Sequence, residues 1–311
     1  MSVLPQSRLD GVIVVNKPAG PTSHDVVALV RRLSGVKRVG HGGTLDPFAS
    51  GVLPVFVGHA TRVVEYHLSD EKGYRATVAF GARSTTDDLD GELTPSTLPP
   101  PTRAAVEAAL AAFRGPLSQV PPAHSAVHVG GRRAYELARD GQVPDLAPRA
   151  VTIESLELVA WQEDDERPTA VLEVRCSAGT YVRALARDLG ERLASGGYLV
   201  ALERTASGPF LVADAHPLET VRAALAGGHA ERVLLPADVG LERFPAINLS
   251  AEELAAVARG QVIRPRGGMA GLGASNGVRL RVLDGDGRLA AIARWEGSRL
   301  HPEKVFVSPS P

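Results

Sequence analysis

Residues 40–58 read GHGGTLDPFASGVLPVFVG and decide the fold of this chain, because they set one carboxylate in a stiff turn before an apolar run. The glycines ahead of Asp46 permit backbone angles that other residues avoid, and Pro47 disfavours helix at the aspartate. The apolar run over 52–57 predicts a buried strand. A loop aspartate ordinarily caps a turn, so a chemical role for Asp46 depends on what the rest of the chain supplies.

The length of 311 residues is about twice that of a typical domain and predicts two domains. An apolar content of 44% and a charged content of 22% are those of an ordinary globular protein. No apolar stretch is long enough to span a bilayer, and the N-terminal residues MSVLPQSRLDG lack the hydrophobic run of a secretion signal. We therefore expect a cytoplasmic protein without membrane contact.

Cys176 is the single cysteine, which excludes a disulfide within the chain and fits a reducing compartment. It shares one face of a predicted strand with Leu172 and Val174, so we expect a packed core thiol and not a nucleophile. No spacing of histidines and cysteines is typical of a zinc site. The chain is therefore expected to hold no metal.

Hydrophobic periodicity outlines the other elements. A helix is predicted after Thr22, whose spacing from Asp25 is that of a capping box, and alternation from Tyr74 to Phe80 predicts a half-buried strand. The further elements expected are a strand over 11–15, a helix over 103–113, a short helix over 133–139 within the polar stretch 119–149, strands over 151–160 and 169–177, and a helix over 181–193. The pattern changes to short strands near residue 238, which predicts a domain boundary there.

Two arginines, Arg183 and Arg187, lie one turn apart at the start of the helix predicted over 181–193. Positive charge there is unfavourable, because the N-terminal end of a helix attracts anions. An anionic partner would compensate it, and Asp46 is the candidate, since arginine binds a carboxylate through two parallel hydrogen bonds. A solvent-facing arginine is the alternative interpretation.

The loop around Asp46 resembles the signature of the bacterial tRNA pseudouridine-55 synthases, G-H-x-G-T-L-D-P-x-A-x-G-x-L. Three more blocks resemble this family in the same order along the chain: NKPAGPTSHD at 16–25, KGYRATVAFGARSTTDDLDG at 72–91 and CSAGTYVRALARDLG at 176–190. The resemblance spans about the first 235 residues. The tail resembles the small RNA-binding β-barrel module, called PUA, that follows the catalytic domain in this family.

The resemblance implies an α/β protein with two domains. Residues 1–238 would form a catalytic domain on a mixed, largely antiparallel sheet flanked by helices, with an RNA-gripping insertion at 119–149. Residues 239–311 would form a PUA-like β-barrel domain. The implied reaction is isomerisation of uridine 55 in the T loop of tRNA, without cofactor or metal. We expect a monomer that binds the T arm of tRNA and needs no protein partner.

The net charge of −1 taken alone argues against a nucleic-acid partner, but the charges are segregated along the chain. Basic residues cluster over 31–38 and again over 259–281, while acidic runs occupy 87–92 and 163–166. Solvated faces would explain these clusters equally well. The resemblance favours the interpretation that both basic clusters face phosphates.

The resemblance also assigns catalytic roles. Asp46 would be the catalytic carboxylate. The resemblance leaves open whether Asp46 attacks C6, attacks C1′ or removes a proton. Arg183 would pair with Asp46. Tyr74 would stack beneath the flipped uracil and is a candidate acceptor for the C5 proton.

Residues expected to bind the substrate are His41, Tyr74, Tyr181, Leu202 and Lys17. His41 would occupy the space that the flipped base leaves in the RNA, Tyr181 and Leu202 would line the uracil pocket, and Lys17 would support that pocket. Without the resemblance, Tyr74, Tyr181 and Leu202 would be ordinary core residues.

Three alternatives remain open on the sequence. A synthase of this type could act on another RNA, although the long 119–149 segment favours recognition of a T loop. A glycosidase that cleaves nucleosides also uses carboxylates, but such enzymes usually need two acids and the Asp46 loop supplies one. A non-catalytic chaperone could instead fold tRNA by binding it.

Overall fold

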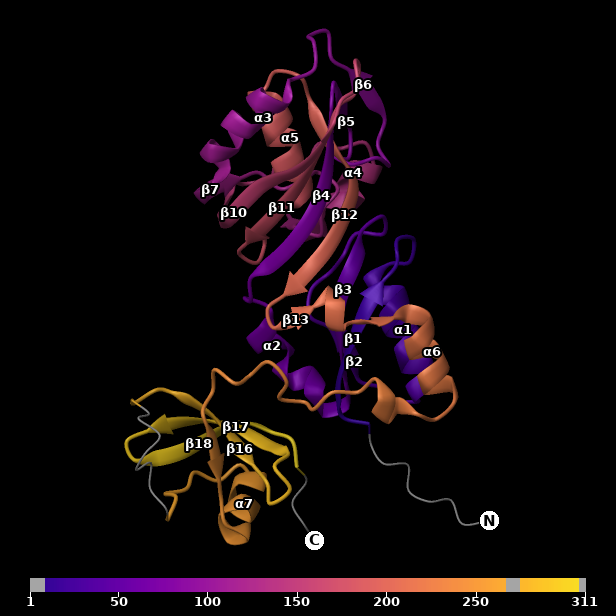
Figure 1. Ribbon diagram of the computed structural model, residues 1–311. Helices are drawn as coiled ribbons and strands as arrows, with labels where there is room; N and C mark the ends of the chain where they lie inside the picture. The colour runs from indigo at the N-terminus through magenta and orange to yellow at the C-terminus, as the bar shows by residue number, and fades with distance from the viewer. Residues whose placement is uncertain (1–8, 267–274, 308–311) are drawn as a thin grey trace.

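The computed structural model describes residues 9–266 and 275–307. Within these residues, the first part of the chain forms a ten-stranded sheet and the last part forms a four-stranded sheet (Figure 1). Within the large sheet, the pairs β1–β14 and β3–β12 are parallel and the other seven described pairs are antiparallel. The expected mixed, largely antiparallel α/β architecture is therefore confirmed.

The large sheet has the strand order β14-β1-β3-β12-β4-β11-β10-β7, with β2 paired to β3 and β13 paired to β12. Its strands are β1 (Gly11–Lys17), β2 (Val39–His41), β3 (Ser50–Val57), β4 (Lys72–Phe80), β7 (Gly115–Gln119), β10 (Arg149–Gln162), β11 (Thr169–Cys176), β12 (Gly197–Ser207), β13 (Phe210–Leu211) and β14 (His216–Pro217). Two separate hairpins are β5 (Ala82–Ser84) with β6 (Leu93–Pro95) and β8 (His128–Val129) with β9 (Arg132–Arg133).

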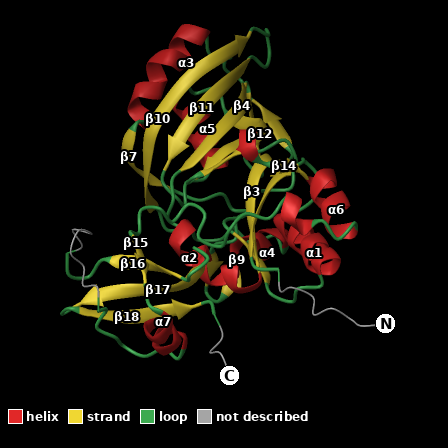
Figure 2. Cartoon of the chain, turned by 60° about the horizontal axis from the view of Figure 1, so that its bottom comes forward, coloured by secondary structure: helices red, strands yellow, loops and turns green. Residues whose placement is uncertain are grey.

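The α-helices are α1 (Ser23–Ser34), α2 (Val64–His67), α3 (Arg103–Leu110), α4 (Ala134–Arg139), α5 (Val182–Arg192), α6 (Leu218–Ala226) and α7 (Ala251–Ala258). Short 3₁₀ turns are η1 (Gly58–Val63), η2 (Ala111–Phe113), η3 (Val212–Asp214) and η4 (Ala230–Arg232). Helices α3 and α5 lie beside β10 and β11, whereas α1 and α6 lie together near β1 (Figures 1 and 2).

Local sequence signals explain where the helices begin. The Thr22 side chain accepts from the Asp25 backbone N–H and the Asp25 carboxylate accepts in return, so the predicted capping box of α1 is present. Gly35 ends this helix with a φ of 68°, a left-handed conformation that glycine adopts without strain. Helix α5 begins one residue later than expected, because Tyr181 is its extended N-cap.

Two halves of the large sheet meet at one short seam. Strand β3 belongs to the half with β1, and β12 belongs to the half with β4. Along these two described strands the only register pairs are Glu203 with Ser50 and Arg204 with Gly51. A Cβ on Gly51 would lie 2.3 Å from the Arg204 carbonyl oxygen, so the close approach requires glycine at this position.

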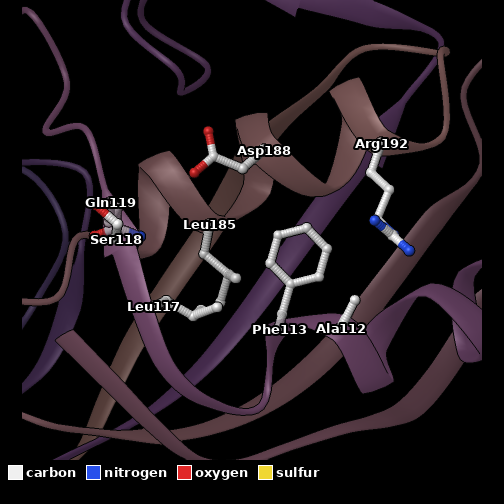
Figure 3. A pocket seen from close by; sticks show the side chains of 8 residues that line it. All are labelled: Ala112, Phe113, Leu117, Ser118, Gln119, Leu185, Asp188 and Arg192. Carbon is white, nitrogen blue, oxygen red and sulfur yellow. The ribbon is translucent and has the colours of Figure 1, made fainter. Parts of the chain in front are cut away.

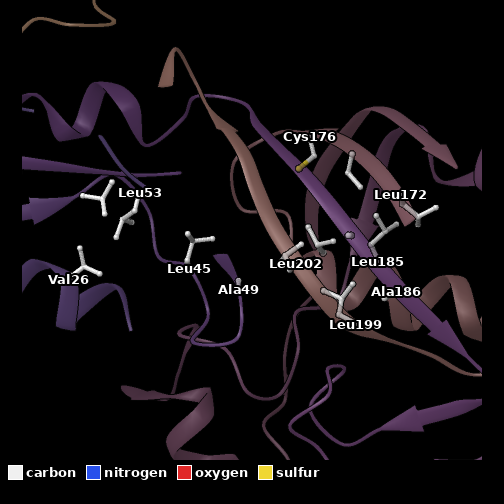
Figure 4. Close-up of a cluster of buried hydrophobic side chains, with 14 of the residues drawn as sticks. Val26, Leu45, Ala49, Leu53, Leu172, Cys176, Leu185, Ala186, Leu199 and Leu202 are labelled. Carbon is white, nitrogen blue, oxygen red and sulfur yellow. The ribbon is translucent and has the colours of Figure 1, made fainter. Parts of the chain in front are cut away.

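A shared apolar core lies beneath the Asp46 loop. Leu45 and Ala49 from that loop and Leu53 from β3 belong to the same buried cluster as Leu185 from α5 and Leu202 from β12 (Figure 4). Burial of each such leucine contributes roughly 1.5–3 kcal/mol. The loop is therefore anchored by apolar packing on both sides of Asp46.

The C-terminal part of the described chain forms β15 (Ala246–Asn248), β16 (Arg279–Leu283), β17 (Leu289–Glu296) and β18 (Arg299–Val305), with α7 packed beside them. We expected a barrel in this part of the chain. In the described residues the edge strands β15 and β18 do not pair with each other, so the structure shows a four-stranded sheet and closure into a barrel stays a prediction. Phe306 and Ile292 pack with Val14 and Phe56 in one cluster, which joins the small sheet to the large one. No helix within 9–266 or 275–307 has both the length and the apolarity to cross a membrane.

Cys176 is fully buried in the core, and burial raises the pKa of its thiol to about 11. At neutral pH the group is therefore protonated, and thiols react as thiolates. We expect iodoacetamide to label the folded protein at least ~100-fold more slowly than the urea-unfolded protein. Rapid labelling of the folded protein at pH 7.5 would contradict the assignment of a core thiol.

Candidate active site

The Asp46 loop runs between β2 and β3 and is held by hydrogen bonds from α1. Ser23 Oγ accepts from the Leu45 N–H at 2.8 Å and donates to the Leu45 carbonyl at 3.2 Å. The Pro47 carbonyl accepts from the Gly20 N–H at 2.8 Å. The loop is thus fixed on both sides of the aspartate.

Lys17 lies below this loop and does not reach its surface. Its side chain is fully buried, and Nζ donates to the carbonyl oxygens of Pro18, Pro21 and Pro47 at 2.9, 2.8 and 3.3 Å. Burial lowers the pKa of Lys17 to about 8, although Asp46 acts in the opposite direction. This position lets Lys17 support the loop, and its expected role in binding the substrate stays a prediction.

Arg204 braces the other side of the loop and was not singled out from the sequence. The residue is 1% exposed. Its guanidinium donates to the carbonyl oxygens of Val52, Thr44 and Gly43 at 2.8, 3.2 and 3.1 Å. Nothing in the sequence pattern distinguishes Arg204 as a buried residue.

Arg183 and Asp46 form the expected pair. Arg183 Nε lies 3.0 Å from Asp46 Oδ2, and Nη2 donates to Oδ1 at 3.3 Å. The Arg183 side chain is 7% exposed and the Asp46 side chain is 36% exposed. One hydrogen bond from Nη2 and one ion-pair contact from Nε therefore hold the carboxylate, while part of it stays open.

Three more acceptors surround the Arg183 guanidinium. Nη1 donates to Asp88 Oδ2 at 3.2 Å and to the Thr86 carbonyl at 3.1 Å, and Nη2 donates to the His124 carbonyl at 3.0 Å. Asp88 belongs to the acidic run 87–92, and the sequence does not indicate that it contacts Arg183. His124 contributes through its backbone, which no side-chain pattern could indicate.

The pKa of Asp46 reflects opposing influences. Burial raises it above the ordinary value for aspartate, the Arg183 guanidinium lowers it, and the negative charge of Asp88 raises it again. The net direction is upward. Asp46 is therefore a carboxylate with increased basicity beside a permanent cation.

A cavity of about 700 Å³ opens in front of Asp46. Tyr74, Tyr181 and Leu202 line it together with Asp46 and Arg183, so the structure brings five of the predicted site residues to one place. Tyr74 also packs against the core cluster that contains Val78 and Phe80, as the alternation in β4 predicts. Burial raises the pKa of the Tyr74 phenol, which Arg204 opposes.

His41 lies on the strand that leads into the loop. Its Nδ1 accepts from the Gly43 N–H at 3.2 Å, and its ring meets the edge of the His24 ring at a centroid distance of 5.6 Å. Burial lowers the pKa of His41, and neighbouring His24 and Arg204 add to this effect. A neutral ring suits the acceptor role of Nδ1.

Comparison with known proteins places this site in a family. A model for the TruB family pseudouridylate synthase N-terminal domain matches residues 31–182, and one for the tRNA pseudouridylate synthase B C-terminal domain matches residues 183–242. The chain is 43% identical over 301 residues to tRNA pseudouridine synthase B of Bradyrhizobium diazoefficiens, covering 95% of this chain and 85% of that protein. The chain belongs to the TruB family. It is therefore a pseudouridine synthase, an isomerase.

Other members and a solved structure agree with this placement of the TruB-family chain. The tRNA pseudouridine synthase B of Thermobifida fusca is 44% identical over 304 residues, which cover 96% of this chain and 99% of that protein. Cbf5 in a crystal structure of a Cbf5-Nop10-Gar1 complex superposes with a TM-score of 0.70 at 26% identity, covering 96% of this chain and 85% of that one.

The basic clusters of this TruB-family enzyme differ in their surroundings. In the C-terminal cluster, Arg266, Arg279 and Arg281 pair with carboxylates of Glu252, Glu303 and Asp238 at 2.7, 2.7 and 2.8 Å. Carboxylates therefore already pair with these three arginines, and the interpretation of the cluster as phosphate-facing stays a prediction. Arg31, Arg32, Lys37 and Arg38 near α1 are exposed.

A smaller cavity of about 200 Å³ lies between α5, η2 and β7 (Figure 3). Phe113, Leu117 and Leu185 supply its apolar wall, with Asp188 and Arg192 at its edge. Neither Asp46 nor Arg183 lines it, so the cavity is separate from the TruB-family site.

Proposed function

We propose that this enzyme isomerises uridine 55 in the T loop of tRNA to pseudouridine, with Asp46 as the catalytic carboxylate. The observation that carries the proposal is the two-point pairing of Asp46 with Arg183 at the wall of a large cavity. The names of the relatives, tRNA pseudouridine synthase B, support tRNA as the substrate. The T arm is the proposed binding partner, with a cytoplasmic monomer acting without a protein partner.

The reaction breaks the N1–C1′ bond of uridine, turns the base and joins C5 to C1′. No atom is lost and no electrons leave, because C5 gives up a proton when it bonds to C1′ and N1, once released from C1′, takes one up. A positioned carboxylate can act as the nucleophile or the base that these reaction steps need. Arg183 keeps Asp46 oriented and favours its ionised form, while burial increases its basicity.

The uridine must leave its stack before it can reach Asp46, at a cost of a few kcal/mol. Tyr74 is proposed to stack on the base, which returns ~1–3 kcal/mol. Tyr181 and Leu202 are proposed to line the rest of the uracil pocket, and their positions on the cavity wall support this. His41 is proposed to fill the vacated space in the RNA, with Lys17 supporting the loop from below.

Residues 239–311 are proposed as a PUA-like RNA-binding domain and 119–149 as the insertion that grips RNA. The insertion lies at the site, since Arg133, Tyr135 and Arg139 from it line the cavity with Asp46. Positive charge there suits a phosphate-bearing substrate. Another structured RNA could also bind the surface formed by these residues. The experiments below therefore also test which RNA is the substrate.

Replacement of the carboxylate separates catalysis from binding. We expect Asp46→Asn to lower the single-turnover rate on an unmodified tRNA transcript by more than about 10³-fold, because an amide is neither nucleophile nor base. The Kd for tRNA should change less than about threefold, since the amide keeps the size of the side chain. Pseudouridine mapping by mass spectrometry measures the first and filter binding the second.

The same experiment separates the alternatives. Free uracil and an abasic site in the product would identify a hydrolase, and pseudouridine at another position or in another RNA would change the substrate assignment. Unchanged pseudouridine formation by Asp46→Asn would remove Asp46 from the mechanism. A pure chaperone would leave the transcript unmodified even with the wild-type enzyme.

The guanidinium geometry is tested by Arg183→Lys. Lysine keeps the charge but cannot contact Asp46 at two points while also reaching Asp88. We expect the fold to persist and the single-turnover rate to fall by ~10²-fold or more. A rate close to that of the wild type, with a normal circular dichroism spectrum, would remove the proposed pair from catalysis.

The raised pKa of Asp46 predicts the direction of the pH dependence. The ionised form is the active one, so the rate is highest above this pKa and falls as the pH drops through it. Because the pKa is raised, the loss should begin at a higher pH than for an ordinary aspartate near 3.9. Single-turnover rates with saturating tRNA between pH 4.5 and 8 measure this, and a rate that rises toward acid would contradict an ionised Asp46.

A further inference from the structure

A second arginine on α5, Arg187, lies one turn after Arg183 and is absent from the residues that line the large cavity. Its Nη1 donates to Asp87 Oδ2 at 2.9 Å, and its Nη2 donates to the Val120 carbonyl at 2.8 Å. Its Nε donates to the carboxylate of Asp188 at 2.9 Å. Arg187 therefore links α5 to two segments that are distant in sequence.

Asp87 has an unusual backbone. Its φ is 62°, in the left-handed region that costs a non-glycine residue about 1 kcal/mol or more. Its carbonyl accepts from the Leu199 N–H at 3.0 Å, and its carboxylate, 12% exposed, binds Arg187. A conformation of this kind persists only where the surroundings hold it, and Arg187 is one of the groups that do so.

The residues on either side of Asp87 both bind Arg183. The Thr86 carbonyl and the Asp88 carboxylate both accept from Arg183 Nη1, at 3.1 and 3.2 Å. The left-handed turn at Asp87 lets both groups face the same guanidinium. Loss of the Arg187 contact would therefore release two acceptors of Arg183 at once.

The second contact of Arg187 acts on the same guanidinium from another direction. Val120, whose carbonyl Arg187 binds, begins the segment that leads to His124. The His124 carbonyl accepts from Arg183 Nη2 at 3.0 Å. Arg187 and Arg183 thus bind the same pair of segments one turn apart.

We propose that Arg187 and Asp87 form a positioning pair, which holds the 86–88 turn and the start of the 119–149 segment so that Arg183 keeps its geometry toward Asp46. This inference rests on the proposed catalytic role of Asp46 and Arg183. The pair touches no reacting atom. Its contribution is to the rate of the chemical step, through the orientation of a neighbouring cation.

The test compares Arg187→Gln, Asp87→Asn and the double variant with a matched control, Arg192→Gln. Asparagine tolerates left-handed φ, so Asp87→Asn removes charge with little change of backbone preference. Arg192 lies on the same helix, is exposed and does not line the large cavity, so its replacement removes equal charge without touching the 86–88 turn. Assays are run at pH 8, because burial raises the pKa of Asp87 to about 6 and its carboxylate is ionised there.

Each single variant should lower the single-turnover rate of pseudouridine formation by about tenfold, with the Kd for tRNA changed less than about threefold. The double variant should be no slower than the worse single one, because both changes break the same contact. Arg187→Lys, which keeps charge but cannot span Asp87 and Val120 together, should recover only part of the rate. Arg192→Gln should match the wild type.

The proposal is overturned if Arg187→Gln and Asp87→Asn react at the wild-type rate, if their effects multiply in the double variant, or if the loss lies in Kd alone. Thermal melting checks the fold of each variant. If Arg187→Gln fails to fold, the comparison of Asp87→Asn with the wild type and with Arg192→Gln decides. Failure of the proposed function looks different. In that case the wild type forms no pseudouridine in the transcript, or Asp46→Asn keeps its rate.

Discussion

The structure depends on one nearly buried cation, the guanidinium of Arg183. Removing a charge from water is costly unless partners compensate it. Arg183 finds them in the carboxylates of Asp46 and Asp88 and in the carbonyl oxygens of Thr86 and His124. These groups come from three places in the sequence, so a single side chain fixes the relative positions of a loop, a turn and an insertion. Of the two carboxylates, that of Asp46 remains partly open, whereas that of Asp88 is almost fully buried.

A second guanidinium, that of Arg204, supports the side of the loop that faces away from Lys17. Arg204 is almost fully buried and binds three carbonyl oxygens of the Asp46 loop and β3. Carbonyl oxygens carry no net charge, so this arginine stabilises backbone geometry without neutralising Asp46. Lys17 stabilises the backbone from the opposite side through three further carbonyl oxygens, and its charge also lowers the pKa of Asp46. The aspartate therefore keeps its charge balance with Arg183 while other cations hold the chain that carries it.

Much of this could be predicted from the sequence where a local signal existed. The capping box at Thr22, the alternation through Tyr74 and the adverse position of Arg183 near a helix start each indicated the observed arrangement. Asp88 and Arg204 were missed, because their importance comes from burial beside segments far away along the chain. Polar residues in local patterns look solvated until tertiary packing encloses them.

The short seam between β3 and β12 has a further consequence. Two register pairs join halves of a sheet whose other described ladders are mostly longer. Amide hydrogens at such a junction exchange with solvent through small openings before the whole domain unfolds. The Asp46 loop borders this seam, so a local opening at the seam would disturb the site before the whole domain unfolds. Catalytic competence is therefore the first property that such an opening would reduce.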